Sequence, residues 1–148
     1  MPLPSPTAAR TRIHKRAISV EGYRRDDGWF DIEGHLVDAK DHDFKVASGV
    51  RPAGVPVHDM RVRLTIDQTL TIRAVDAVSD AMPYVGECDR ITPAYRKLIG
   101  MKIEAGFRLR VLQLMGGVEG CTLNGDRVRH GERCGANLSW AVAELARS

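Results

Sequence analysis

The chain has 148 residues, of which 43% are hydrophobic and 28% are charged, a balance typical of a soluble globular protein large enough to bury one core. No apolar run approaches the roughly 18 residues that cross a bilayer, and the N-terminus lacks the apolar segment of a secretion signal. Three widely spaced cysteines argue against a disulfide framework and favour a reducing, cytoplasmic location.

Positive charge is concentrated at the start of the chain. Residues 1–25 carry a net charge of +5, and the remainder carries −2. Such a segment can contact phosphates, but Ile13, Ile18 and Val20 interrupt this one and indicate the approach to a strand. We therefore expect neither nucleic acid nor a membrane as partner. Residues 1–12, with three prolines, predict a flexible arm ahead of a single domain over residues 13–148.

Alternation with a period of two predicts strands in the N-terminal half. Asp26-Asp27-Gly28 is a strong hairpin turn, and the alternation after it runs from Trp29 to Asp38. One face of this strand is apolar and the other is polar, with Phe30, Ile32 and Leu36 opposed to Asp31, Glu33 and His35. A second hairpin is predicted from Met60–Ile66 and Leu70–Ala77, around a turn at Asp67-Gln68.

From about residue 90 the apolar period becomes that of helices. Thr92-Pro93 predicts an N-cap followed by proline at the first helical position, and Gly100 ends that helix. Two further helices are indicated by apolar stripes at Phe107, Val111 and Leu114 and at Leu138, Val142 and Leu145. Strands followed by helices predict an α+β fold, with an antiparallel sheet from the N-terminal half covered on one face by C-terminal helices.

The polar stripe of Asp31, Glu33 and His35 is one candidate site. Two carboxylates beside an imidazole can perform general acid–base chemistry, and Arg24 or Arg25 can orient an anionic substrate. A sheet with one solvated face produces the same stripe for structural reasons alone. The stripe thus leaves open a small enzyme acting on an anionic small molecule through the polar sheet face.

His58, Asp59, Cys88 and Cys121 are a candidate metal site. An imidazole, a carboxylate and two thiolates form a suitable tetrahedral set for zinc, and thiolates also suit an iron–sulfur cluster. The hairpin that starts at His58 returns the chain near its origin, so Cys88 can approach His58. Cysteines also pack as small hydrophobic residues. The alternative is a metal-free interaction module, a homodimer paired through its sheet edge or helices.

Several motifs resemble a bacterial family known as domain of unknown function 2889. They are Gly22-Tyr23-Arg24-Arg25-Asp26-Asp27-Gly28, Asp31-Ile32-Glu33-Gly34-His35-Leu36, His58-Asp59-Met60, Pro93-Ala94-Tyr95-Arg96 and Gly120-Cys121-Thr122. The resemblance covers about residues 10–123 and implies no assigned activity. The family usually places histidine after the Gly-Cys-Thr motif, whereas Leu123 stands there in this chain.

A more remote resemblance links the second half to NifU-type scaffold domains, on which iron–sulfur clusters are assembled. Those domains place a cysteine and an aspartate before a strand of the form Met-x-Leu-x-Ile, then a hairpin and two further cysteines. Here His58-Asp59-Met60, Cys88 and Cys121-Thr122 follow that order, with His58 in place of the first cysteine. The leading hypothesis is therefore an accessory scaffold or carrier protein that binds zinc or a cluster.

Overall fold

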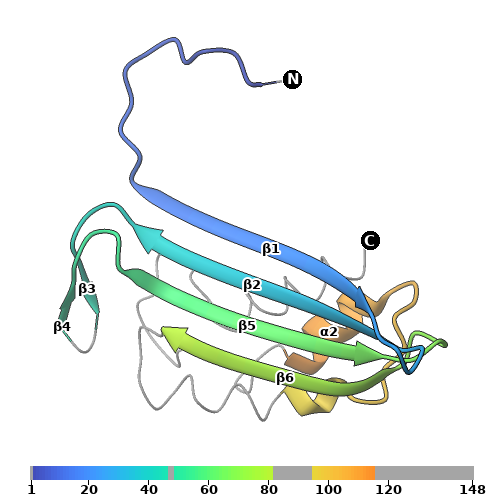
Figure 1. Ribbon diagram of the computed structural model, residues 1–148. Helices are drawn as coiled ribbons and strands as arrows, with labels where there is room; N and C mark the ends of the chain where they lie inside the picture. Colours follow the sequence, from blue (N-terminus) through green and yellow to red (C-terminus); the bar gives the residue numbers. More distant parts are fainter. Residues whose placement is uncertain (1, 47–48, 82–94, 116–148) are drawn as a thin grey trace.

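A computed structural model describes residues 2–46, 49–81 and 95–115 of the chain. Its main element is a four-stranded antiparallel sheet with the strand order β1-β2-β5-β6 (Figure 1). These strands are β1 (His14–Arg24), β2 (Phe30–Lys40), β5 (Pro56–Ile66) and β6 (Ile72–Ala81). A separate two-stranded hairpin, β3 (Phe44–Val46) and β4 (Gly49–Arg51), projects between β2 and β5.

The strand pairing follows the alternation of the sequence. Gly28 adopts a φ of 84° in the turn from β1 to β2, a conformation that suits a residue without a Cβ atom. Strands β2 and β5 pair in register from Phe30 opposite Ile66 to Asp38 opposite His58. Directly paired residues point to the same face. The predicted sheet containing residues 29–40 and 61–66 is confirmed, as is the hairpin of β5 and β6.

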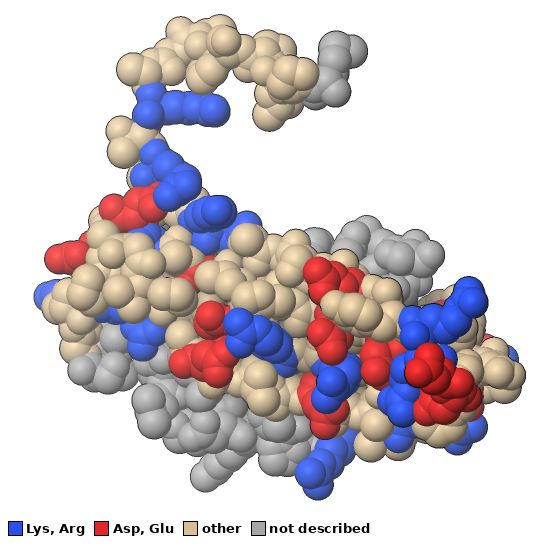
Figure 2. All heavy atoms as spheres, in the orientation of Figure 1, with Lys and Arg blue, Asp and Glu red and all other residues tan. Residues whose placement is uncertain are grey.

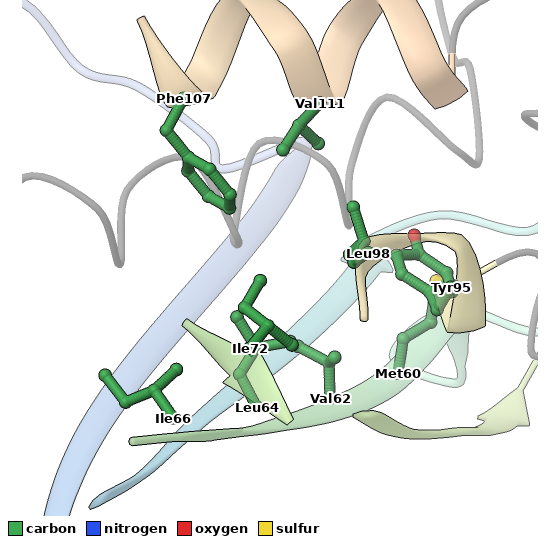
Figure 3. Close-up of a cluster of buried hydrophobic side chains, with 9 residues drawn as sticks. All are labelled: Met60, Val62, Leu64, Ile66, Ile72, Tyr95, Leu98, Phe107 and Val111. Atoms are coloured by element: carbon green, nitrogen blue, oxygen red, sulfur yellow. The ribbon is translucent and has the colours of Figure 1, made fainter. Parts of the chain in front are cut away.

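One face of the sheet carries the hydrophobic core. The side chains of Met60, Val62, Leu64 and Ile66 on β5 are at most 4% exposed, and Ile72 on β6 is fully buried. Facing them are four buried residues from beyond the sheet, which Figure 3 shows above β5 and β6: Tyr95, Leu98, Phe107 and Val111. The last two belong to the helix α2 (Phe107–Met115), so that predicted helix is present and turns Phe107 and Val111 to the sheet, whereas Leu114 of the predicted stripe is 37% exposed.

The predicted α+β class, with C-terminal helices covering one face of the sheet, is wrong. Strands dominate the regular structure, and the described residues contain only the short helix α2 and the 3-10 turn η2 (Arg96–Leu98). The helix expected at residues 138–145 lies outside the described residues. Within the described part, helix is too sparse for a layer, and none is long and apolar enough to span a membrane.

The helix predicted to end at Gly100 ends earlier for a tertiary reason, and its predicted start at Thr92-Pro93 lies outside the described residues. Ile99 already has an extended backbone, and Gly100, with a φ of 90°, turns the chain toward β6. The amide of Gly100 donates to the carbonyl of Ile72, and the amide of Ile72 donates to the carbonyl of Met101. These hydrogen bonds along the start of β6 replace the ones that a longer helix would have made.

Candidate functional site

The face of the sheet turned away from α2 is polar and hollowed. A depression of about 380 Å³ lies over the middle of all four main strands. Its polar lining includes Glu21 from β1, Glu33 and His35 from β2, Arg61 and Arg63 from β5, and Asp76 from β6. This volume lies within the range of small-molecule sites. Figure 2, viewed onto this face, shows acidic and basic side chains mixed across it.

A histidine–aspartate pair joins two strands at this depression. Nε2 of His35 lies 2.7 Å from Oδ1 of Asp59, and the two side chains are 33% and 22% exposed. A carboxylate only accepts hydrogen bonds, so a neutral His35 donates from Nε2 and keeps its lone pair on Nδ1. The structure thus joins one residue of the predicted acid–base stripe with one residue of the predicted metal site.

Two arginines lie among the carboxylates of the same depression. Arg63 is 3.0 Å from Asp76 and 3.6 Å from Glu33, and Arg61 contacts Asp80 and lies 3.9 Å from Asp59. The side chain of Arg61 is 49% exposed and that of Arg63 is 47% exposed. Water therefore screens these ion pairs, and a ligand can reach the guanidinium groups.

The two arginines proposed for substrate binding lie elsewhere. Arg24 pairs with Phe30 across the β1–β2 ladder, which places it on the opposite side from His35. Arg25 lies in the turn, where it donates to Asp27 at 2.7 Å and to Asp31 at 3.4 Å. Asp31, the third member of the predicted stripe, also accepts a hydrogen bond of 2.6 Å from Thr65. This end of the stripe is occupied by internal contacts.

His58 and Asp59 are separated by the sheet. They are consecutive on β5, so their side chains point to opposite faces. Asp59 reaches His35 on the polar face, whereas His58 is 2% exposed on the core face. Side chains on the two faces cannot share one ion. Cys88 and Cys121, the other predicted ligands, lie outside the described residues.

On its own face, His58 joins a cluster centred on the buried Asp38, which also includes His14 and Arg16 from β1, each with a side chain 36% exposed. Asp38 is 1% exposed and accepts hydrogen bonds from His14 and from Arg16, the latter at 2.6 Å. Nδ1 of His58 lies 3.7 Å from Oδ2 of Asp38, too far for a hydrogen bond, and it is buried with no hydrogen-bond partner. Asp38 therefore concentrates negative charge at the edge of an apolar core.

The neighbours of Asp38 keep it ionised. Burial by itself raises the pKa of a carboxyl group, but the adjacent His58 and the hydrogen bonds from His14 and Arg16 act in the opposite direction and prevail. The pKa of Asp38 therefore lies well below its ordinary value. Among the described residues, no group of three or more histidine, cysteine or acidic side chains is arranged to hold a metal ion.

Reasoning from the sequence missed this cluster, although one signal for it was present. Asp38 falls in phase with Phe30, Ile32 and Leu36 on the apolar face of β2. A charged residue at an apolar position of an alternating strand requires a partner once it is buried. The partners come from β1 and β5, at separations of 20 to 24 residues along the chain.

Comparisons with known proteins add a family but no function. A search of curated proteins and a search of solved structures each found no match. A family model described as "Protein of unknown function (DUF2889)" matches residues 14–130, which is most of the chain and spans both the polar depression and the buried cluster. The chain therefore belongs to the DUF2889 family.

Proposed function

We propose that this protein is a small enzyme that transfers a proton to or from an anionic small molecule bound on the polar sheet face. The observation that carries the proposal is the 2.7 Å contact between His35 and Asp59 at a depression of about 380 Å³. His35 is the catalytic base, and Asp59 is a positioning residue that selects the tautomer with its lone pair on Nδ1.

The rest of the depression supports an anionic ligand. Arg61 and Arg63 are both about half exposed and stand on the same strand as Asp59. Their present partners are exposed carboxylates, which contribute little stability to such pairs. A carboxylate or phosphate group of a ligand replaces those partners at small cost, and this fixes the remainder of the molecule next to His35.

The proposal predicts separate effects for the base and its positioning residue. The assay uses the full chain and a panel of hydroxy acids, keto acids and phosphate monoesters, with binding followed by NMR and turnover by product formation. His35→Ala should lower kcat by about 100-fold or more with little change in KM, because acid–base catalysis contributes about that factor. Asp59→Asn should lower kcat less and should change its pH profile. Arg63→Gln should raise KM.

His42→Ala is the matched control, because His42 is exposed and lies outside the depression. It should leave both constants unchanged. The proposal fails if no panel member binds on the polar face. It also fails if His35→Ala turns over a bound substrate as fast as the unmodified chain.

Metal binding is a second candidate, favoured by the buried Nδ1 of His58. A histidine that binds a metal through one ring nitrogen usually directs its other ring nitrogen toward a carboxylate. Nδ1 of His58 lies 3.7 Å from Asp38, which leaves the other ring nitrogen of His58 for the metal. In this candidate His58, Cys88 and Cys121 hold zinc or an iron–sulfur cluster, and Asp38 replaces Asp59 in a supporting role. Ala81 pairs with Asp59, the residue after His58, and Tyr95 lies beside Met60 in the core (Figure 3), so the two described residues that flank 82–94 both stand by the first half of β5.

Elemental analysis of untagged protein separates the two candidates. Metal binding predicts about one zinc ion per chain, or the iron of one cluster, lost in Cys88→Ser and retained in Asp59→Asn. Turnover at His35 predicts the reverse sensitivity, with kcat lowered in Asp59→Asn and unchanged in Cys88→Ser. Metal-free unmodified protein, or equal metal content in both variants, contradicts metal binding.

A further inference from the structure

We propose that two copies of this chain pair through the outer edges of their β1 strands and form one continuous antiparallel sheet. The observations that carry this inference are the regularity of the β1 edge, a carboxylate on it that has no cation among the described residues, and a lysine placed to supply one. The inference does not rest on the proposed enzyme activity.

The outer edge of β1 is long, straight and accessible. β1 pairs with β2 over eleven consecutive residues without a bulge, and in the described part of the chain no strand lies on its other side (Figure 1). All its residues are exposed except Ile18, which is half-buried. An edge of this kind presents unpaired backbone donors and acceptors to any strand that can lie along it.

The other edge of the sheet is protected. The pairing of β6 with β5 shifts register twice, between Asp59 and Met60 and between Thr65 and Ile66. Such irregularities twist an edge away from a partner strand. The start of β6 is also covered, because its Ile72 exchanges hydrogen bonds with the segment at Gly100 and Met101. Sheet extension is therefore favoured at β1.

Glu21 gives the β1 edge an unbalanced charge. It stands directly opposite Glu33 on β2, and carboxylates that face each other across strands repel. Glu33 has Arg63 at 3.6 Å on its other side, whereas the only described partner of Glu21 is the hydroxyl of Tyr23. A cation supplied from beyond β1 would give Glu21 the kind of partner that Arg63 gives Glu33.

A second copy supplies that cation in one register. Antiparallel pairing of β1 with itself, centred on Ile18, places Lys15 of each copy directly opposite Glu21 of the other and matches polar face with polar face. Ile18 then faces Ile18 of the second copy on the core face, and Val20, now 38% exposed, becomes buried beside it. Centring the pairing on Ala17 or Ser19 places Lys15 opposite Ser19 or Tyr23 and leaves Glu21 without a cation.

The dimer also alters the polar depression. Glu21 and Ser19 form its β1 side, which is open in a single copy. In the register centred on Ile18, Lys15 of the second copy stands across from Glu21 at this side. Pairing therefore adds a positive charge to a site in which Arg61 and Arg63 already share their contacts with carboxylates.

Charge reversal tests both the dimer and its register. Sedimentation velocity of the full chain over a range of concentrations should show a monomer–dimer equilibrium. Lys15→Glu and Glu21→Lys should each weaken it by about tenfold or more, because each places two like-charged pairs across the interface. The double variant, with both substitutions, should restore dimerisation to within about threefold. Circular dichroism confirms that each variant is folded.

Lys45→Glu is the control, since it makes the same charge change at an exposed position of β3. It should leave dimerisation unchanged. A monomer at every concentration overturns the inference, and so does a dimer that both single variants leave intact. A dimer weakened by the single variants but not restored by the double variant overturns the Lys15–Glu21 register.

Discussion

Asp38→Ala should lower the free energy of unfolding by about 2 kcal/mol at neutral pH, the cost expected for losing hydrogen bonds to a buried charged group whose partners His14 and Arg16 are themselves exposed. Asp38 is 1% exposed and accepts hydrogen bonds from both His14 and Arg16. Without it, those two side chains lose their acceptor. The buried ring of His58 also loses the carboxylate nearest to Nδ1. The end of the sheet formed by β1, β2 and β5 should loosen first.

Urea denaturation of the two proteins at one pH measures this difference. Asp59→Ala is the matched control, because Asp59 is also an aspartate that contacts a histidine but lies on the polar face at 22% side-chain exposure. Its cost should be about 1 kcal/mol or less, as for a solvated pair. An Asp38→Ala variant no less stable than Asp59→Ala would show that the buried cluster does not hold the strands together.

The protein should lose stability steeply as the pH falls below about 5, through the carboxyl groups whose folded pKa lies below the unfolded value of about 3.9. Asp38 is one of them. Asp67 is another, because the side-chain hydrogen bond from Thr69, together with hydrogen bonds from the Thr71 backbone and the Arg73 side chain, outweighs burial and lowers its pKa. Below the unfolded pKa, the unfolded chain binds protons that the folded chain does not bind. The stabilisation is therefore complete at neutral pH and is lost as the pH falls.

Denaturant midpoints between pH 6 and pH 2 measure the slope. Asp38→Asn and Asp67→Asn should each be less stable than the unmodified chain at pH 6 and should approach it at pH 2. Glu104→Gln is a suitable comparison, because Glu104 is an exposed carboxylate in a surface pair with Arg110. It should leave the slope nearly unchanged. A parallel decline of all three variants would mean that neither aspartate controls the acid response.

Local pattern was sufficient to predict the sheet. The period of two over residues 29–38 and 60–66 assigned each side chain to a face, because a strand alternates whatever it packs against. The same rule placed Glu33 and His35 together on the solvated side. The end of the helix predicted at Gly100 was placed too late because capping signals act locally, whereas the hydrogen bonds of the Gly100 segment to β6 depend on distant residues.

The candidate sites depended on contacts that no local pattern contains. His35 meets Asp59, and Asp38 meets His14, Arg16 and His58, through strand pairings 20 to 24 residues apart in the chain. Neighbours in sequence were in turn separated, since His58 and Asp59 point to opposite faces of β5. Alternation already implied that separation. Which residue each side chain would meet was settled by the register of three strands, and that register follows from burying one apolar face as a whole.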